Sequence, residues 1–452
     1  MEQLLTNVRK GSLWTYAIIL TVVGLVFSYM ATHFAGASAG DYDASLINSG
    51  DTAWMLASTA LVMIMTPAVG FFYGGMVSSK NIVSVLKQSM VILALISVQW
   101  VLVGYSLAFG PDVHGLIGDF SFFGLRGVGF APDANYAGTI PALVFMAFQA
   151  MFAIITPALI IGAFVERIKF RTLVVFTLLW STLVYDPIAH WVWSPSGWLH
   201  AMGALDFAGG TVVHMSAGFS ALAAAMLVGK RIQAKTLSSA GNVPFVILGA
   251  GLLWFGWFGF NAGSALTSGA LAASAFVVTN TAAAAAALTW VMLSWAENKK
   301  PSALAAAIGA VCGLVAITPA SGYVGPIAAI AIGILTGVVT YIAVHIRGRS
   351  IRIDDSLDVW AGHGIGGLTG AVLTGVFAEK AINSAGNNGL LFGNAHQLGV
   401  QLIAVIAAGA YAFIATYIIL KVLSFFMPLR VSSEDEEAGL DLSTHGESGY
   451  QL

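Results

Sequence analysis

The stretch AGGTVVHMSAGFSALAAAMLVG, residues 208–229, decides the fold class of this chain. It contains no Asp, Glu, Lys or Arg, and it has the length of roughly 20 apolar residues that a helix needs to cross a bilayer. Because lipid offers no hydrogen bonds to a backbone, such a segment must be helical. One ionisable side chain, His214, stands inside it, and a buried polar ring in a membrane span predicts a functional site.

The composition of the whole chain agrees with a membrane protein. Of its 452 residues 58% are hydrophobic and only 9% are charged, with a mean hydropathy of +0.85, whereas a soluble domain carries about 25% charged residues. A net charge of −2 gives no indication of nucleic-acid binding. The single cysteine, Cys312, excludes an intramolecular disulfide and a thiolate metal cluster. We therefore predict an all-α polytopic protein that crosses the lipid bilayer of the cell membrane.

Eleven apolar runs are long enough to span that bilayer. A further run at 13–31 follows a basic N-terminus and precedes an A-x-A cleavage site, so residues 1–39 are either a cleaved signal peptide or a retained twelfth helix. We expect a transmembrane domain over 48–426 and a C-terminal regulatory tail over 427–452. The eleven predicted spans are 54–76, 84–109, 141–165, 170–190, 208–229, 243–262, 268–296, 303–320, 324–346, 360–378 and 398–426.

The orientation follows from the basic residues, which concentrate in every second connection. Cytoplasmic loops carry the excess of Lys and Arg, so the first of the eleven spans begins outside and the C-terminal tail lies in the cytoplasm. The connections between these basic ones contain at most one Lys or Arg. The basic connections hold Lys80 and Lys87; Arg167, Lys169 and Arg171; Lys230, Arg231 and Lys235; Lys299 and Lys300; and Arg347, Arg349 and Arg352.

Two groups of five spans resemble each other, with one span left over. GFFYGGMVSS (70–79) is similar to GWFGFNAGSA (256–265), and the fifth spans carry His214 and His363 in FAGGTVVHMSAG and WAGHGIGG. Because five is odd, the second group must enter the membrane from the opposite side. This predicts a 5+5 inverted repeat, whose interface near mid-membrane is the usual transport site.

The two histidines are the main candidates for function. A single His in a span could be a packing residue bonded to a carbonyl, but two at matching repeat positions favour a shared site on the central axis, where the rings could share a hydrogen bond. Two His without nearby carboxylates or thiolates are too few for a metal, and no cofactor is indicated. We find no charged residue deep in any span, which suits a small neutral molecule better than a permanent ion.

The entrance to such a pathway should gather a cation, and aromatic faces can do so. Trp193, expected in the outside loop HWVWSPSGW (190–198), Phe152 and Phe260 are possible contributors, although any one aromatic is more often a lipid-facing or interfacial residue. Asp206 precedes the His214 span, where it is best explained as a helix N-cap and otherwise as a cation-binding carboxylate. Asp358 occupies a similar place before His363.

At this point the chain resembles the ammonium transporters of the Amt/Mep/Rh family, over about residues 48–450. The resemblance rests on MTPAVGFFYGGMVSSKN, FQAMFAIITPALIIGAFVERIKF, DFAGGTVVHMSAGFSAL, WFGFNAGSA and DDSLDVWAGHG, which occur in the family's usual order. The tail EEAGLDLSTHGESGY is similar to that of bacterial and archaeal Amt proteins rather than Rh proteins.

The resemblance implies a homotrimer with one pore per subunit, which carries ammonium or ammonia, with methylammonium as a further candidate substrate. It implies an external ammonium site at Trp193 and Ser264, a stacked gate of Phe152 and Phe260, twin pore histidines at His214 and His363, and Asp206 as a support of the external site. A PII-type signalling protein would bind at the cytoplasmic tail. The alternatives are an ammonium sensor that signals through its tail and an Rh-type neutral-gas channel. An intramembrane enzyme would need a nucleophile or metal set beside the His, and none is apparent.

Overall fold

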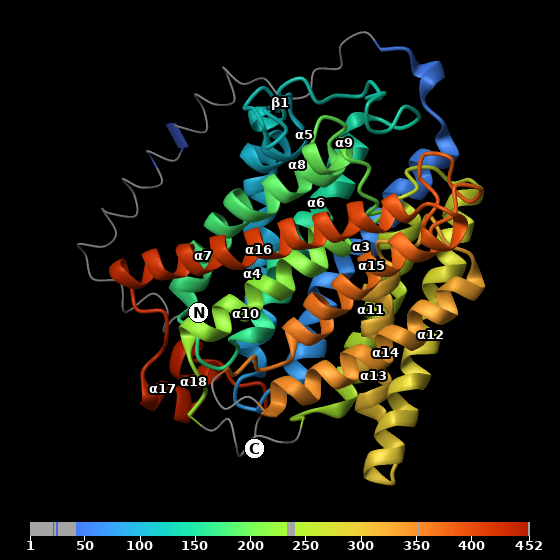
Figure 1. The fold of residues 1–452 in the computed structure, drawn as a ribbon. Coiled ribbons are helices and arrows are strands. Elements are labelled where there is room, and N and C mark those ends of the chain that lie inside the picture. Colours follow the sequence, from blue (N-terminus) through green and yellow to red (C-terminus); the bar gives the residue numbers. More distant parts are fainter. Residues whose placement is uncertain (1–20, 22–23, 26–41, 233–239, 350–352, 451–452) are drawn as a thin grey trace.

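The computed structural model describes residues 21, 24–25, 42–232, 240–349 and 353–450 of the chain. The prediction for residues 1–39 therefore falls almost entirely outside the described residues. Within them, helices run side by side as a bundle, and the longest, α16, crosses the outer side of α10 and α15 (Figure 1).

Each of the eleven predicted spans is helical in the structure. Nine helical segments of the described residues are long and apolar enough to cross a membrane, and α13 is a shorter apolar helix. Four spans contain a π-helical turn, η2, η5, η6 or η7. The spans are α3 (Ser49–Met76); α4 (Ile82–Gln99), η2 (Trp100–Gly104) and α5 (Tyr105–Phe109); α6 (Ala142–Ile160) with η4 (Ile161–Ala163); α7 (Phe170–Trp180), η5 (Ser181–Tyr185) and α8 (Asp186–Trp193); η6 (Gly210–Met215) and α10 (Ser216–Val228); α11 (Val243–Gly263); α12 (Ala270–Asn298); α13 (Ala303–Ile317); α14 (Pro326–Arg349); η7 (Trp360–Ile365) and α15 (Gly366–Phe377); and α16 (Ala395–Phe426).

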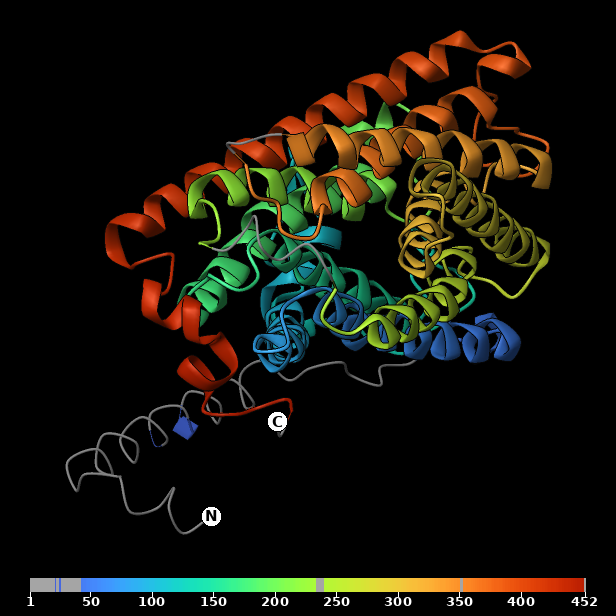
Figure 2. The ribbon, with the colours of Figure 1, turned by 90° about the horizontal axis from the view of Figure 1, so that it is seen from below.

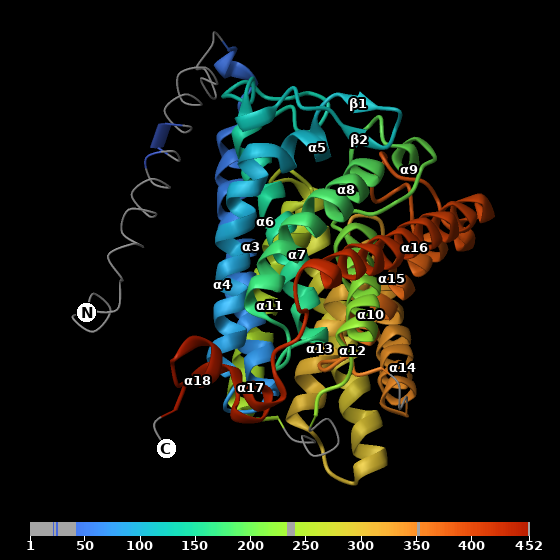
Figure 3. The ribbon, with the colours of Figure 1, turned by 90° about the vertical axis from the view of Figure 1, so that its left-hand side faces the viewer.

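Short elements cover the two ends of the bundle (Figure 3). We call the end with β1, β2 and α9 the loop face and the end with the tail helices α17 and α18 the tail face. The short elements are η1 (Ala44–Leu46), β1 (Asp112–Val113), β2 (Ile117–Gly118), η3 (Phe123–Leu125), α9 (Trp198–Ala201), η8 (Leu390–Phe392), α17 (Ser433–Ala438) and α18 (Leu440–His445). The strands β1 and β2 form an antiparallel hairpin that pairs Asp112 with Gly118.

The first helices of the two repeats, α3 and α11, pack against each other (Figure 2), and the contacts at their ends show that they run in opposite directions. At one end the Asn242 N–H donates to the Gly75 carbonyl over 2.8 Å. At the other end the Ser268 N–H donates to Asp51 over 2.7 Å. Glycine allows this approach, because a Cβ at Gly249 would lie only 2.3 Å from the backbone nitrogen of Phe72. The antiparallel pair has the geometry that an inverted repeat requires.

The fifth spans of the repeats cross at the centre of the bundle, again at glycines. A Cβ on Gly218 of α10 would lie 2.1 Å from the backbone nitrogen of Gly364 in η7. A Cβ on Gly367 of α15 would lie 2.8 Å from the carbonyl oxygen of Gly210 in η6. Backbone therefore meets backbone at the crossing, as small residues allow in membrane helices, and this brings the two π-helical turns with their histidines together.

Candidate functional site

An outer chamber opens near the loop face, with a volume of about 250 Å³. Trp193, Ser264, Phe152 and Gln149 are among the side chains that line it. Water-sized molecules occupy about 30 Å³ each, so a small hydrated cation fits. The structure corrects one prediction here, because Trp193 is not in a loop but is the last residue of α8. Its indole N–H donates to the Asp206 carbonyl over 3.0 Å, which fixes the ring at the chamber wall.

Ser264 contributes an available oxygen to the same chamber. It follows directly after the last residue of α11, and its hydroxyl donates to the Phe260 carbonyl over 2.8 Å. Since this bond uses the only hydroxyl proton, the lone pairs of Oγ are left to accept from a donor in the chamber. Trp193 and Ser264, predicted together from the resemblance, thus line one cavity.

Two phenylalanine rings close the floor of the outer chamber. The ring centroids of Phe152 on α6 and Phe260 on α11 lie 4.2 Å apart at an interplanar angle of 34°. Phe152 also meets Trp193 edge to face at 5.7 Å. Both phenylalanines are at most 1% exposed. The pair is therefore a buried aromatic contact at the inner side of the chamber, where the resemblance predicts a gate.

Beyond the phenylalanines lie the two histidines, one on each π-helical turn. The ring of His214 stacks at 5.9 Å on Phe260 and at 5.3 Å on Trp257. Its Nδ1 lies 3.3 Å from Nδ1 of His363. Both histidines are buried, and Nε2 of His214 has no hydrogen-bond partner among the described residues. This nitrogen is free to bond a passing molecule, because the other ring nitrogen faces its twin.

An inner chamber of about 220 Å³ begins at His363 and leads toward the tail face. Its walls are largely apolar, and its polar contributors include Asp358 and Ser356. A narrow cavity beside Trp257 joins both histidines to the same region. The outer chamber, the phenylalanine pair, the histidine pair and the inner chamber are thus linked in that order, each to the next through a shared or contacting residue.

Asp206 makes the contacts of a helix cap. Its Oδ1 accepts from the backbone N–H groups of Gly209 and Gly210, and its Oδ2 accepts from those of Thr211 and Val212, over 2.6–3.0 Å. These are the unpaired N–H groups at the start of the His214 helix, where a carboxylate is stabilised by the helix dipole. All four acceptor positions face backbone, so Asp206 acts on the chamber through the helix it holds.

The counterpart of Asp206 in the second repeat is Asp355, which corrects the prediction for Asp358. Asp355 accepts from the Trp360 N–H at the start of the His363 helix over 2.7 Å. Asp358 instead forms an ion pair with Arg347, over 2.5 and 2.9 Å. The sequence distance already agrees, because Asp206 precedes His214 by the same number of residues as Asp355 precedes His363.

A charged residue does lie deep in one span, contrary to the prediction that none does. Asp186 is fully buried within the Phe170–Ala201 segment. Gln99 donates to its Oδ2 over 2.9 Å, and its Oδ1 has no partner among the described residues. It lies apart from the side chains that line the chambers. The same described residues contain no group of three or more His, Cys, Asp or Glu placed to hold a metal ion.

Sequence reasoning missed two residues that touch the pathway, Trp257 and Gln149. Trp257 stacks on His214, and its N–H donates to Thr318 over 2.8 Å. Gln149 lines the outer chamber with an oxygen that has no partner in the described chain. An aromatic residue in an apolar span gives no signal of its own, whereas the polar Gln149 inside FQAMF could have been noticed.

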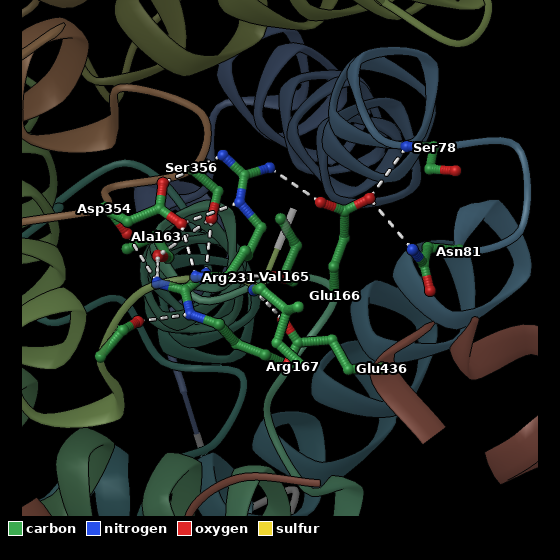
Figure 4. Close-up of polar contacts among 12 residues, drawn as sticks. Ser78, Asn81, Ala163, Val165, Glu166, Arg167, Arg231, Asp354, Ser356 and Glu436 are labelled. Carbon is green, nitrogen blue, oxygen red and sulfur yellow. Dashed lines mark hydrogen bonds and ion pairs between the residues drawn. The ribbon is translucent and has the colours of Figure 1, made fainter. Parts of the chain in front are cut away.

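A polar network ties the tail face together around two arginines (Figure 4). Arg231 donates to Glu166 over 2.8 Å and to Asp354 over 2.9 Å. Burial alone would lower the pKa of Arg231, but its hydrogen bonds and its attraction to these carboxylates raise it above the usual value. The buried Arg167 donates to the carbonyl of Asp354 over 2.6 Å. The loop that precedes the His363 helix is therefore anchored by charges from two other loops.

The tail packs onto this network. Glu436 of α17 accepts from the Ile232 N–H over 2.7 Å and from Arg430 over 2.6 Å. Asp441 of α18 accepts from the Ser84 N–H over 2.7 Å and from the Val83 N–H over 3.1 Å, at the start of α4. The tail is thus bound to the ends of several spans near the inner chamber.

Comparisons with known proteins agree with this architecture. An ammonium transporter of Bacillus subtilis is 49% identical over 402 residues, which cover 89% of this chain and 98% of that protein. Ammonium transporter Amt1 of Archaeoglobus fulgidus is 48% identical over 405 residues, which cover 89% of this chain and all of that protein. Both relatives are thus matched over nearly their full length.

Solved structures share the fold. The crystal structure of Saccharomyces cerevisiae Mep2 matches with a TM-score of 0.82 and 36% identity, over 86% of this chain and 89% of that one. A sensor Amt protein matches with a TM-score of 0.80 and 33% identity, over 88% of this chain and 98% of that one. The model of the Ammonium Transporter Family matches residues 53–450. With the repeat, the linked chambers and these matches in agreement, the chain belongs to the ammonium transporter family.

Proposed function

We propose that this protein transports ammonium across the membrane. Ammonium is recruited in the outer chamber by Trp193 and Ser264 and loses its proton at the Phe152–Phe260 pair. Ammonia then passes along His214 and His363 into the inner chamber. The observation that carries this proposal is the unbroken series of contacts from the outer chamber through the two ring pairs to the inner chamber.

The chemistry of the outer chamber and of the phenylalanine pair supports this order of cation recruitment and deprotonation. The indole face of Trp193 attracts a cation by about 0.5–2 kcal/mol, and Ser264 Oγ has lone pairs to accept an N–H. Beyond the phenylalanines an unpaired charge is costly in the apolar interior. Ammonium avoids that cost by giving up its proton, whereas potassium has none to give. The proton that ammonium gives up at the phenylalanine pair passes to water in the outer chamber, and an ammonium-evoked current would show that it then crosses separately from ammonia.

The orientation in the membrane is part of the proposal. The tail face carries Lys80, Lys87, Arg167, Arg231 and Arg347, and the positive-inside rule assigns such a face to the cytoplasm. The loop face with Trp193 then lies outside, so net flow from the outer to the inner chamber is uptake.

We further propose a homotrimer with one pore per subunit and a tail that a PII-type protein can engage. The exposed apolar side chains of α12 and α14, such as Leu288, Met292, Ile327 and Ile342, offer surface for lipid or for a neighbouring subunit. The tail contacts α4 and the loop after α10, which supports a role for it at the tail face. A protein that binds the tail could therefore control the cytoplasmic end of the pore.

A sensor is the second candidate, because one structural neighbour is titled a sensor Amt protein. A sensor would bind ammonium and signal with little flux. A Rh-type gas channel is less well supported, because Trp193 lines the outer chamber and the tail packs on the tail face.

The test is charge movement in proteoliposomes when ammonium is added. Wild-type protein should give an ammonium-evoked current or a pH change in the lumen, and His214→Ala should reduce it. Binding of ammonium without current or pH change would support the sensor instead. A response unchanged by His214→Ala would remove that histidine from the pathway.

A further inference from the structure

His190 is a buried histidine that the proposed transport path does not use. It lies on α8, three residues before Trp193, and is 0% exposed. Its Nδ1 lies 2.9 Å from the carbonyl oxygen of Ala108 at the end of α5. Its Nε2 lies 2.9 Å from Oδ1 of Asp112 in β1. The ring thus bridges the Trp193 helix to two other elements at the loop face.

Both partners of this ring can only accept. A carbonyl oxygen has no proton to give. A carboxylate likewise has no proton to give, and that of Asp112 already accepts from the Gly115 N–H over 2.7 Å. A neutral imidazole carries one N–H and would turn a lone pair toward one of the two acceptors. Only the doubly protonated ring donates to both.

The position of His190 ties this charge to Trp193. The His190 carbonyl accepts from the Ser194 N–H over 3.2 Å, directly after Trp193. A Cβ on Gly197 would lie 2.0 Å from the same carbonyl oxygen, so the turn that follows folds tightly back on this point. At the other end of α8, Asp186 is held by Gln99. Asp112 is the only charged group of the described chain within ion-pair distance of the ring.

We propose that His190 is held as an imidazolium ion by Asp112 and the Ala108 carbonyl, and that this clamp of two hydrogen bonds positions Trp193 in the outer chamber. His190 and Asp112 do not line that chamber, so they are positioning residues and not ligands. The positioning role rests on the proposed function of Trp193, whereas the charge of the ring does not. The clamp would set the affinity for ammonium and leave passage through the pore unaffected.

Variants of Asp112 test the clamp without disturbing the core. Asp112→Ala removes the acceptor at Nε2. Asp112→Asn can keep the bridge, because its amide can donate to the lone pair of a neutral His190. Asp119→Ala is the matched control, since Asp119 lies in the same connection and also caps a loop N–H, that of Ser121 over 2.8 Å.

The readout is the KM and maximal rate of methylammonium uptake. Asp112→Ala should raise KM about tenfold, equivalent to about 1.4 kcal/mol of lost positioning, with the maximal rate retained. Asp112→Asn and Asp119→Ala should stay within about twofold of wild type, as surface substitutions do. A KM that is unchanged in Asp112→Ala, or a loss of maximal rate alone, would overturn the positioning role.

Nitrogen NMR of the histidine rings tests the charge independently of transport. The His190 signal is identified as the one that disappears in His190→Gln. This signal should show two protonated ring nitrogens in the wild-type protein and one in Asp112→Asn. A neutral ring in wild type overturns the clamp. If Trp193→Leu leaves KM unchanged, Trp193 is not part of the external ammonium site, and the positioning role of His190 is then wrong as well. The NMR result still shows whether the His190 ring is charged.

Discussion

The Nδ1 atoms of His214 and His363 lie 3.3 Å apart, each on the π-helical turn of its own repeat. One proton must lie between two such nitrogens, because two lone pairs or two N–H groups would repel. One ring is therefore protonated at Nδ1 and the other at Nε2. A neutral pair then offers one acceptor and one donor to a molecule in the pathway, which matches ammonia.

This shared proton predicts that the two histidines act as a unit. We expect His214→Ala and His363→Ala each to lower ammonium-driven current strongly, and the double variant to be about as impaired as either single one. The reason is that each single substitution already breaks the common hydrogen bond, and residues in contact do not contribute additively. Currents from the four proteins at equal amounts in liposomes form the test. Fully multiplicative losses would show that the rings act independently.

The caps of the two histidine helices should differ in their importance for stability. Asp206 receives four backbone N–H groups, and Asp206→Asn replaces an acceptor-only group by one that repels some of them. We expect a loss of about 2 kcal/mol or more, seen as a lower thermal unfolding temperature in detergent. Asp355→Asn, which affects the Trp360 N–H, should lower that temperature less. Equal losses would contradict the assignment of Asp206 as the stronger cap.

Acidification should release the tail through His445. Burial, and next the charge of Lys87, lower the pKa of His445 below its usual 6.5, although Asp441 and Glu447 oppose this. A group whose pKa is lowered in the docked state stabilises docking above pH 6.5, and this stabilisation is lost as the pH falls through the lowered pKa. Nδ1 of His445 lies 3.2 Å from Nζ of Lys87, so protonation places two cations together.

A spin label on the exposed tail residue Thr444, attached through Thr444→Cys, would report this release. The native Cys312 is buried. The label should become more mobile as the pH falls from 6.5 through the lowered pKa of His445. In a His445→Gln background the mobility should be independent of pH over that range. A pH response that survives this substitution would assign the switch to another group.

The crossing of the fifth spans predicts a severe effect of one methyl group. Gly218→Ala would place a Cβ 2.1 Å from the Gly364 backbone, and backbone cannot rotate away as a side chain can. We expect a cost above about 3 kcal/mol and a large loss of folded protein in size-exclusion profiles. Gly251→Ala on α11, where nothing lies within 4 Å, is the control and should be tolerated. A stable Gly218→Ala protein would refute the close crossing.

Much of the fold could be predicted from the sequence because hydropathy and loop charge are set by the bilayer itself. The eleven apolar runs all became helices, and the similarity of the segments around Phe71 and Trp257 corresponds to the antiparallel pair α3 and α11. His214 and His363 could be identified because an ionisable ring inside a membrane span is costly and therefore rare without a function. These signals are local or periodic, so a single sequence carries them.

The remaining errors concern contacts between distant residues. Asp186 sits near the end of the predicted span 170–190, but the helix continues beyond it and Gln99 reaches it from another span. Asp355 and Asp358 are close in sequence, and only the structure shows that Arg347 engages the latter. The π-helical turns that carry His214 and His363 likewise leave no pattern in composition.

The backbone contact between Gly218 and Gly364 also limits how this molecule can work. Transporters built from inverted repeats commonly rock one half against the other to expose a site alternately to each side. Here the halves interlock at their midpoint with no side chains between them to slide or repack. Sliding of one span across the other at that point would bring backbone atoms into collision. We therefore expect passage to depend on small rotations of rings such as Phe152 and Phe260 within an otherwise stationary frame, as in a selective conduit rather than a moving carrier.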